Sequence, residues 1–335
     1  MTGEAVRRLA SECGFELAGV ASAEPPEDFE RYRTWIEKGC AGEMRYLTDR
    51  RAVVREDPRN LLPTARSIIC VGKLYNTEGP SDGIISRYAW GEDYHRVMRE
   101  GLARLVELLD REAGPFEYKI CVDTAPLLER SYARQAGLGW IGKNTCLIHE
   151  PLGSWFFLGE ILTSLRIEPD SPPPDRCGTC TRCIDACPTE ALVPDGSGQW
   201  TLDSRRCISY LTIELRGPIP EEHREAMGSH IFGCDICQDV CPWNRRAPLT
   251  DDPAFRERPW PELETFLKLS PEEFNRIGDG SPIARAKHRG ILRNVAIAAG
   301  NAGLELLREP VEDLAASPDE MLAEHAQWAL KKLLE

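Results

Sequence analysis

Apolar and polar residues alternate with more than one period along the chain, and the first of these periods is helical. Apolar side chains recur every three or four residues over 3–13, and they do so again over 29–38, after the prolines at 25 and 26. This spacing places them on one face of an α-helix. Residues 1 to about 60 are therefore expected to form helices joined by loops.

A second pattern follows, in which short apolar runs flank a helical one. Residues 67–72 form an apolar run of strand length, residues 118–123 form a second, mostly apolar one, and a helical pattern over 94–109 lies between them. Two further strands are predicted at 146–149 and 154–162. Strands and helices in this order indicate one α/β domain over 1–168.

Proline punctuates the second half of the chain. The proline-rich segment 168–175 is stiff and suits a domain boundary, and residues 248–282 are again rich in proline. Three segments beyond it have helical spacing: 284–300, 304–316 and 320–334. Paired helices of this length are typical of helical repeats. Residues 283–335 are therefore predicted to be an all-α, HEAT-like repeat region.

Size and charge limit the function classes. The 335 residues suffice for about two domains of 100–200 residues. No apolar stretch reaches the roughly 18 to 20 residues of a membrane helix, and the first residues lack the pattern of a secretory signal, so we expect a soluble, cytoplasmic protein with no membrane partner. The net charge, 41 basic minus 54 acidic residues or −13, argues against nucleic-acid binding over the whole surface but allows a local basic patch.

Cysteine usage is more informative, because eight of the 13 cysteines fall within 65 residues. In a reducing cytosol such a group favours metal ligands over disulfides. The run Cys177-x2-Cys180-x2-Cys183-x3-Cys187-Pro has the spacing of a bacterial iron–sulfur motif. In that motif three thiolates bind one cubane and the fourth binds the other cluster.

A shortened second copy, Cys234-x2-Cys237-x3-Cys241-Pro, supplies three ligands where a cubane needs four, and Cys207 restores the count. The exchange of one ligand between the motifs gives two sets: Cys177, Cys180, Cys183 and Cys241 in the first, and Cys187, Cys207, Cys234 and Cys237 in the second. Residues 176–247 are thus predicted to be a ferredoxin-like module with two [4Fe-4S] clusters. Two structural zinc sites, which also take four cysteines each, are the alternative interpretation.

Several segments of the chain together resemble one enzyme family, the epoxyqueuosine reductases. They lie at 122–130, 136–145, 207–214, 234–244 and 281–290. The resemblance extends over nearly the whole chain. It implies an oxidoreductase that carries two [4Fe-4S] clusters and a cobalamin held base-off, with 1–168 as the cobalamin-binding catalytic domain.

The same resemblance implies a reaction. Epoxyqueuosine would be reduced to queuosine at the wobble position of a tRNA anticodon, so that an epoxide becomes an alkene. The partners would be a tRNA carrying epoxyqueuosine and a low-potential electron donor, and we expect a monomer. Two alternatives are a cobalamin-dependent reductive dehalogenase, which shares the cofactor set, and a non-enzymatic electron-transfer ferredoxin, which would leave about 160 N-terminal residues without a role.

Asp123 is the candidate general acid. It stands at the end of an apolar run, where a strand can present a carboxyl group to a cleft, although it could instead cap a helix that begins near Pro126. The resemblance implies that it protonates the substrate. An ordinary aspartate is almost fully ionised at pH 7, so this role calls for a pKa raised by about three units through desolvation.

Two further groups of residues are candidates for cobalamin contact. The glycines of the G-x-G-x-x-G segment and the lysine after it, Gly137, Gly139, Gly142 and Lys143, follow a helical pattern rather than a strand, so a dinucleotide site is not expected. A turn that closes a helix is the alternative. The second group is Tyr88, Asp93, His95 and Ser209. Met98 occupies the position where a histidine-on cobalamin motif needs glycine, so His95 is not expected to bind cobalt. Of the two clusters, the one that contains Cys207 is expected to lie nearer to the cobalt.

A local surplus of positive charge reverses the sign of the whole chain. Residues 281–308 carry five basic side chains and one acidic one, a surplus of +4. Composition alone favours a solvated helix face for such a segment, but the resemblance favours contact with the tRNA backbone. The candidate contacts are Arg216, Arg285, Lys287, Arg289 and Arg293.

Overall fold

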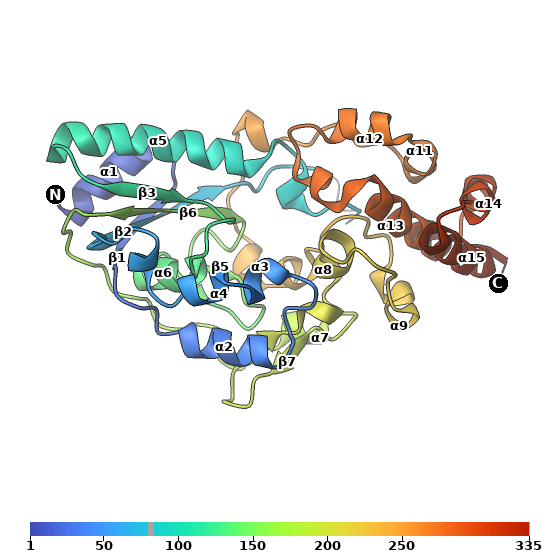
Figure 1. The fold of residues 1–335 in the computed structure, drawn as a ribbon, viewed down its shortest axis with the longest axis horizontal. Coiled ribbons are helices and arrows are strands. Elements are labelled where there is room, and N and C mark those ends of the chain that lie inside the picture. Colours follow the sequence, from blue (N-terminus) through green and yellow to red (C-terminus); the bar gives the residue numbers. More distant parts are fainter. Residues whose placement is uncertain (80–83, 335) are drawn as a thin grey trace.

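The computed structural model describes residues 1–79 and 84–334 (Figure 1). Its N-terminal part is built on a four-stranded sheet with the order β1-β2-β6-β3, in which each neighbouring pair is antiparallel. The strands are β1 (Leu17–Ser22), β2 (Ser67–Leu74), β6 (Phe156–Thr163) and β3 (Tyr118–Cys121). β2 and β3 run in the same direction but are not paired, because β6, which follows both in the sequence, lies between them.

Helices cover both faces of this sheet, and this explains the continuous apolar run of β2. They are α1 (Gly3–Glu12) and α5 (Tyr94–Ala113) on one face and α6 (Glu129–Gln135) on the other. Ile69 packs with Leu105 in the first layer, whereas Ile68 packs with Tyr132 in the second. Successive residues of β2 therefore face different layers, and the whole strand is buried. The predicted α/β character of this part is confirmed.

The expectation that residues 1–60 form only helices and loops is wrong, because β1 lies within them. The strand Leu-Ala-Gly-Val-Ala-Ser consists of small residues that give a weak strand signal. Their smallness has a packing reason: a Cβ on Gly19 would lie 2.0 Å from the carbonyl oxygen of Ala136, just beyond α6. The strand predicted at 146–149 is also shorter than expected, since only β5 (Leu147–Ile148) forms, paired with β4 (Trp140–Ile141).

Short elements occupy the centre of the molecule. Before β2 these are α2 (Phe29–Glu37), α3 (Arg45–Thr48) and α4 (Arg51–Val54). After β6 they are α7 (Arg182–Asp185), β7 (Leu192–Pro194), β8 (Trp200–Leu202), α8 (Ile208–Ile213), α9 (Glu221–Arg224) and α10 (Ile236–Asp239). α7 and α10 each begin within one of the two cysteine motifs and contact one another.

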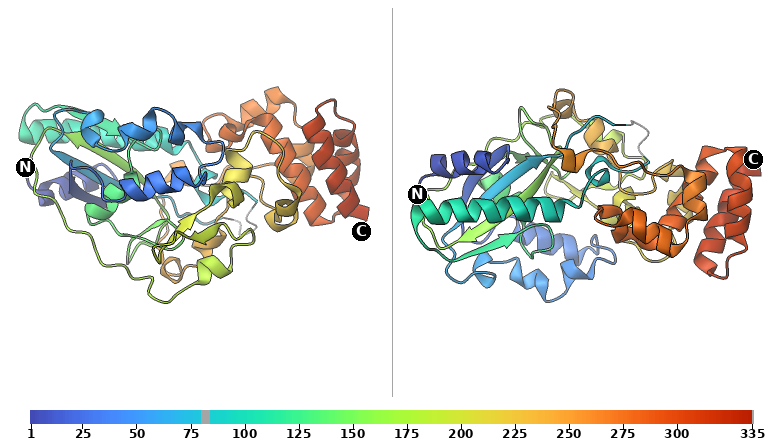
Figure 2. Two further views of the ribbon diagram at one scale, coloured as in Figure 1. Left: turned by 60° about the horizontal axis from the view of Figure 1, so that its bottom comes forward. Right: turned by 90° about the horizontal axis from the view of Figure 1, so that it is seen from above.

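The C-terminal helices pack together at the end of the molecule opposite the N-terminus (Figure 2). They are α11 (Leu263–Lys268), α12 (Pro271–Gly278), α13 (Lys287–Ala302), α14 (Arg308–Ala315) and α15 (Glu320–Leu334). α13 is buried continuously from Ile291 to Gly300, and α15 approaches it so closely that a Cβ on Gly300 would lie 2.8 Å from the Cα of Ala329. The HEAT-like repeat stays a prediction. None of the helices in the described ranges combines the length and apolar character needed to cross a bilayer.

α11 and α12 lie in the proline-rich segment 248–282, where no helix was predicted. α12 carries a complete N-terminal signature, because the Ser270 hydroxyl accepts from the Glu273 N–H and the Glu273 carboxylate accepts from the Ser270 N–H. Pro271 occupies the first helical position, where its missing N–H costs nothing. The prolines here therefore begin helices rather than exclude them.

Arg293 joins α13 to the cysteine module and is not a surface residue. Its side chain is fully buried, and its guanidinium donates to the carbonyl oxygens of Leu211, Leu215 and Gly217 at 2.6–2.9 Å. Burial lowers its pKa to about 10. The predicted contact of Arg293 with tRNA is wrong, because the side chain has no surface to offer a phosphate.

His325, on α15, makes the stability of the molecule sensitive to acid. Its Nε2 accepts the N–H of Ile219 at 3.0 Å and its Nδ1 bonds the carbonyl oxygen of Met321, while burial lowers its pKa to about 4. An unfolded histidine, with a pKa of about 6.5, takes up its proton earlier. The folded state therefore loses stability as pH falls from about 6.5 to about 4, by up to about 3 kcal/mol.

Chemical unfolding at a series of pH values between 7.5 and 4 measures this loss. The variant His325→Gln keeps an acceptor but cannot titrate, so its stability should fall less steeply over the same range. Equal slopes for the two proteins would contradict the assignment.

Candidate active site

A cavity of about 940 Å³ lies between the sheet, the cysteine module and residues 281–287. Its volume is at the upper end of the range of about 300–1,000 Å³ that is usual for small-molecule and cofactor sites. Many of the lining residues are aromatic or aliphatic, among them Tyr32, Trp35, Met44, Tyr46, Leu47, Tyr88, Tyr94, Leu127, Leu128, Ile141 and Ile213. Such a cavity suits a large ligand with extensive apolar surface.

Asp123 presents its carboxylate to this cavity just beyond the end of β3. The residue is in the left-handed region, with φ of 50°, which the short polar side chain of aspartate tolerates better than most. The N–H of Thr124 donates to the carbonyl oxygen of Val122 across the turn. Asp123 does not cap the following helix: the N-cap of α6 is Leu128. The alternative of a helix-capping aspartate is therefore excluded.

Three side chains form a continuous chain of hydrogen bonds, which we call the Asp–His–Asp chain. Nδ1 of His95 lies 2.7 Å from Oδ1 of Asp93, and its Nε2 lies 3.1 Å from Oδ2 of Asp123. Asp93 is the N-cap of α5 and also accepts the N–H of His95. One helix start thus fixes two members of the chain, and the end of β3 fixes the third.

His95, the central member of the Asp–His–Asp chain, carries a positive charge at neutral pH. Burial of the His95 ring opposes its charge, but hydrogen bonds to Asp123 and Asp93 and the charges of both carboxylates raise its pKa to about 9. An imidazolium donates from both nitrogens, which matches the two carboxylates. With both ring nitrogens engaged, His95 has no free lone pair for a metal.

Asp123 is ionised in this arrangement. Burial raises its pKa, but the hydrogen bond and charge of His95, the charge of Arg285 and a hydrogen bond from Tyr94 together lower it below the ordinary value. The side chain keeps 43% of its surface open. That surface faces the cavity, since Asp123 is one of the lining residues, and the protein surrounds it otherwise.

Arg285 stands beside Asp123 instead of on an exposed helix face. Its Nη1 lies 4.0 Å from Oδ2 of Asp123, and its Nε lies 2.6 Å from Oε1 of Glu214. The guanidinium also lies over the ring of Tyr46, 5.5 Å from the centroid. Arg285 thus balances two carboxylates in the cavity wall.

Electrostatic interactions connect cysteines of the same predicted set, and the two four-ligand sets stay a prediction. In the first, burial and the neighbouring thiolates of Cys177, Cys241 and Cys180 raise the pKa of Cys183 to about 11. In the second, burial and the thiolates of Cys207 and Cys187 raise the pKa of Cys234 to about 12. Such mutual repulsion of thiolates is what a bound cation would relieve.

The second set borders the cavity. Cys207 is the N-cap of α8, and both Cys207 and Ser209 line the cavity. Cys146, which the sequence count left without a role, lies beside Cys237 and shares a hydrogen bond with its thiol. Part of the cavity wall is thus built by the module that carries the cysteines.

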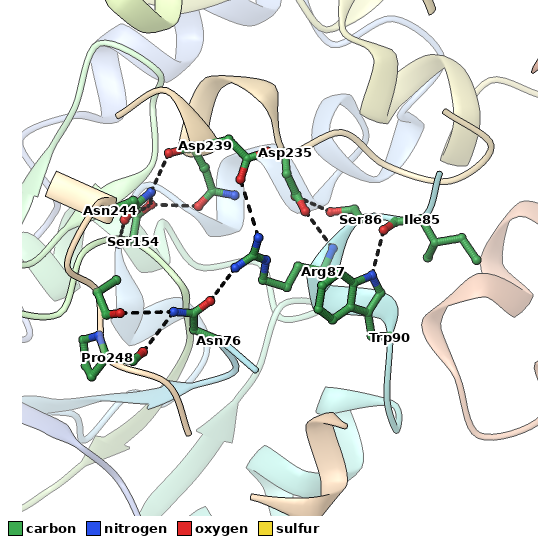
Figure 3. A network of polar contacts seen from close by, with 12 residues as sticks. Asn76, Ile85, Ser86, Arg87, Trp90, Ser154, Asp235, Asp239, Asn244 and Pro248 are labelled. Atoms are coloured by element: carbon green, nitrogen blue, oxygen red, sulfur yellow. Dashed lines mark hydrogen bonds and ion pairs between the residues drawn. The ribbon is translucent and has the colours of Figure 1, made fainter. Parts of the chain in front are cut away.

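A polar network ties the cavity wall to the second cysteine motif (Figure 3). The Ser86 hydroxyl and the Arg87 N–H donate to the two oxygens of Asp235, at 2.5 and 2.7 Å, and Asp235 follows Cys234 directly. The Arg87 guanidinium donates to Asn76 at 2.6 Å and stacks on Trp155. The next residue, Tyr88, lines the cavity, so the position of the cysteine motif and that of the wall are coupled.

The glycine segment contacts protein instead of the cavity. Nζ of Lys143 donates to the carbonyl oxygens of Gly178 and Cys180, at 2.7 and 2.9 Å. A Cβ on Gly139 would lie 2.2 Å from the carbonyl oxygen of Ile148, and one on Gly142 would meet the Ile148 side chain. Gly137 has φ of +80° just after α6, as a turn that closes a helix requires. None of these four residues is among the described residues that line the cavity.

Comparison with known families agrees with these features. Residues 176–244 match the family model described as "4Fe-4S double cluster binding domain", and residues 55–124 match "Epoxyqueuosine reductase QueG, DUF1730". An epoxyqueuosine reductase from Xanthomonas campestris pv. campestris is 43% identical over 97% of this chain and 94% of its own length. One from Escherichia coli K12 is 37% identical over 98% of this chain and 89% of its own. The chain belongs to the epoxyqueuosine reductase family.

Solved structures of epoxyqueuosine reductases share the fold. A crystal structure with a tRNA-Tyr epoxyqueuosine-modified stem loop has a TM-score of 0.90 and 30% identity, over 99% of this chain and 90% of that one. The enzyme from Streptococcus thermophilus has a TM-score of 0.87 and 32% identity, over 99% and 90%. Membership of an oxidoreductase family excludes the interpretation as a ferredoxin without enzymatic activity.

The five basic residues predicted to bind tRNA do not share one environment in this chain. Arg289 pairs with Asp319 on the surface, and Arg216 donates to the carbonyl oxygen of Ala286. Lys287 is exposed and lines the cavity, and its own backbone φ is 63°. With Arg285 paired inside the cavity, the five residues do not form one exposed patch.

Three residues at or beside the cavity, Arg45, Arg50 and Glu129, were not predicted from the sequence. Arg45 and Arg50 are exposed on and after α3, next to the lining residues Tyr46 and Leu47. Glu129, the first residue of α6, accepts the N–H of Asp123 at 2.5 Å. The basic run of residues 45–55 was a visible signal, whereas nothing in the sequence separates Glu129 from other helix-start glutamates.

The charge of His95 can be observed directly. In protein with isotope-labelled histidine, the His95 signals in a nuclear magnetic resonance titration should report an imidazolium up to a pH of about 9. Asp123→Asn removes one charged acceptor and should lower the pKa of His95 by about one unit or more. Asp319→Asn, at the surface pair with Arg289, is the matched control and should leave it unchanged. An uncharged His95 at pH 7 in the unaltered protein would contradict the Asp–His–Asp chain.

Proposed function

We propose that this chain reduces epoxyqueuosine to queuosine at the wobble position of a tRNA anticodon, with two [4Fe-4S] clusters and a base-off cobalamin. The observation that carries the proposal is one cavity that is lined both by the Asp–His–Asp chain and by Cys207 and Ser209 of the cysteine module. A relative with the same fold has been crystallised with an epoxyqueuosine-modified tRNA stem loop, which supports the substrate.

The donor sets fit two iron–sulfur clusters. Each set offers four thiols, the number that a cubane requires, and the double-cluster family model covers all eight cysteines. The first motif would contribute Cys187 to the set that borders the cavity, and the second motif would contribute Cys241 to the other set. Electrons would therefore leave the protein through the set of Cys207, which stands at the cavity wall.

The cavity fits a cobalamin in size and chemistry. A corrin ring presents a broad apolar face, and aromatic residues such as Tyr32, Trp35 and Tyr46 line the walls. Ser209 and Tyr88 would hold its rim. Bound there, the cofactor would collect electrons singly from the clusters and supply the two that carbon–oxygen cleavage consumes. Because both nitrogens of His95 are engaged, this residue would have no lone pair to offer the cobalt.

The residues of the chain would manage the protons. Converting an epoxide to an alkene and water takes up two electrons and two protons. Asp123 is the group that faces the cavity, and its proton would come along the hydrogen bond from the His95 imidazolium. Arg285 would then stabilise the carboxylate that remains. Asp123 thus acts as the general acid through its partner, without a raised pKa of its own.

Exposed cations beside the cavity would position the anticodon loop. Lys287, Arg45 and Arg50 have no ion-pair partner among the described residues, so their charges are free to meet phosphates. A base splayed into the aromatic cavity would supply selectivity. This division of roles resolves the conflict between the net charge of −13 and a nucleic-acid substrate.

Asp123→Asn tests the general acid. The amide cannot release a proton, so turnover of epoxyqueuosine-containing tRNA should fall by about 100-fold or more, while cobalamin absorbance and tRNA affinity should stay near those of the unaltered protein. Asp319→Asn serves as a control with unchanged turnover. Full activity of Asp123→Asn would remove the assignment, and loss of cobalamin binding would make its role structural.

Alanine at Lys287, Arg45 and Arg50 tests the tRNA contacts. Each lost phosphate contact should lower the slope of log affinity against log salt by about 0.7, the value for single strands. Arg111→Ala, at the far end of α5, removes an exposed charge away from the cavity and should leave the slope unchanged. If the triple variant keeps the original slope, these residues do not contact the backbone.

A further inference from the structure

A second pair of carboxyl groups lies behind Asp123, away from the Asp–His–Asp chain. Glu160 is on β6, and its side chain is fully buried. In the sheet register it stands between Cys70 of β2 and Cys121 of β3. Directly paired residues point to the same face of a sheet, so the three side chains form one row, which faces the layer that contains α6.

Glu160 has nothing in the described part of the chain to stabilise a negative charge. Its oxygens accept from no backbone N–H or basic side chain there, and the one group that shares a hydrogen bond with its carboxyl is another acid, Glu129. Its neighbours in the row are two buried thiols, and no basic residue is among the groups that act on it. An unpaired buried carboxylate is costly, so the group takes up a proton instead. Burial and the charge of Glu129 accordingly raise its pKa well above the ordinary value.

Glu129 connects this buried acid to the cavity. It lines the cavity, and its Oε1 accepts the N–H of Asp123 at 2.5 Å. Burial and the negative charge of Asp123 raise the pKa of Glu129 to about 7, although Arg130 opposes the shift. Other groups facing the pair are Asp123 itself and Tyr94. Glu129 therefore exchanges its proton close to neutral pH.

The reaction gives this pair a task. Reduction of an epoxide to an alkene and water takes up two protons for two electrons, and the His95 imidazolium holds only one. Asp123 is ionised before each turnover. A second proton must reach the cavity, and Glu129, which accepts the Asp123 N–H, is a further titratable neighbour of Asp123.

We propose that Glu129 and Glu160 form a buried proton store that supplies Asp123 with the second proton of each turnover. Glu129 releases its proton to Asp123, and Glu160 replaces it. The epoxide oxygen leaves as water, the two electrons come through the cysteine module, and solvent returns the store to its starting state. The inference rests on the proposed function, and Glu129 and Glu160 act through Asp123 without touching substrate.

Infrared spectroscopy tests the store without any reaction. Unaltered protein at pH 8 should show the carbonyl stretch of a protonated carboxyl group, which shifts in heavy water and disappears in Glu160→Gln. The control Cys70→Ala changes the same buried row without removing a carboxyl and should keep the band. Absence of the band in the unaltered protein would overturn the proposal.

The pH profile of turnover tests the supply. In unaltered protein the rate should fall as pH rises above about 7, when Glu129 loses its proton. Glu129→Gln should be slower by about tenfold or more at pH 7 and should lack this decline, with tRNA affinity unchanged; Glu129→Asp should restore part of both. A profile for Glu129→Gln that matches the unaltered protein would overturn the supply role. If the band is present but unaltered protein leaves the epoxide intact, the proposed function fails, and the supply role with it, while the buried acid stands.

Discussion

The hydrogen bond between His95 and Asp123 is the contact around which the cavity is organised. It joins the first turn of α5 to the turn after β3, and it places a positive charge between two carboxylates that would otherwise repel. Arg285 adds a second positive charge beside the same oxygen of Asp123. Without these cations, Asp123 would be a carboxylate in an aromatic cavity, where desolvation alone would neutralise it.

Charge balance of this kind links three separate parts of the chain. Glu214 belongs to the segment after α8, Arg285 precedes α13, and Asp123 follows β3, so one row of alternating charges crosses from the cysteine module to the sheet. Arg293 and Asn294 join α13 to α8 and the residues that follow it, because their side chains donate to backbone carbonyls within residues 211–217 and of residue 231. The cavity thus has walls that share a buried polar foundation as well as apolar packing.

Local and non-local information explain what could be predicted from the sequence. The cysteine sets followed from spacing and counting, because ligand number is a chemical constant, and the helices followed from their apolar period. β1 was missed because small residues carry no strand signal, although they are what the end of α6 requires. The environment of Asp123 depends on residues as distant in sequence as His95 and Arg285, so its ionisation could not be read from its neighbours. Arg293 illustrates the same limit: its sequence context is basic and helical, and only tertiary packing decides that it is buried.

The position of β6 also orders the events by which the chain reaches this state. Leu74 pairs with Phe156 and Ser67 with Thr163, so strand partners are 82 to 96 residues apart. The edges of β2 and β3 that pair with β6 stay unpaired until β6 has been synthesised. Sheets closed over such separations form slowly. The cysteines of both motifs all come later in the chain. The whole sheet that carries Asp123 therefore leaves the ribosome before the first cysteine of either motif, so the sheet and the cysteine module become available for folding in that order.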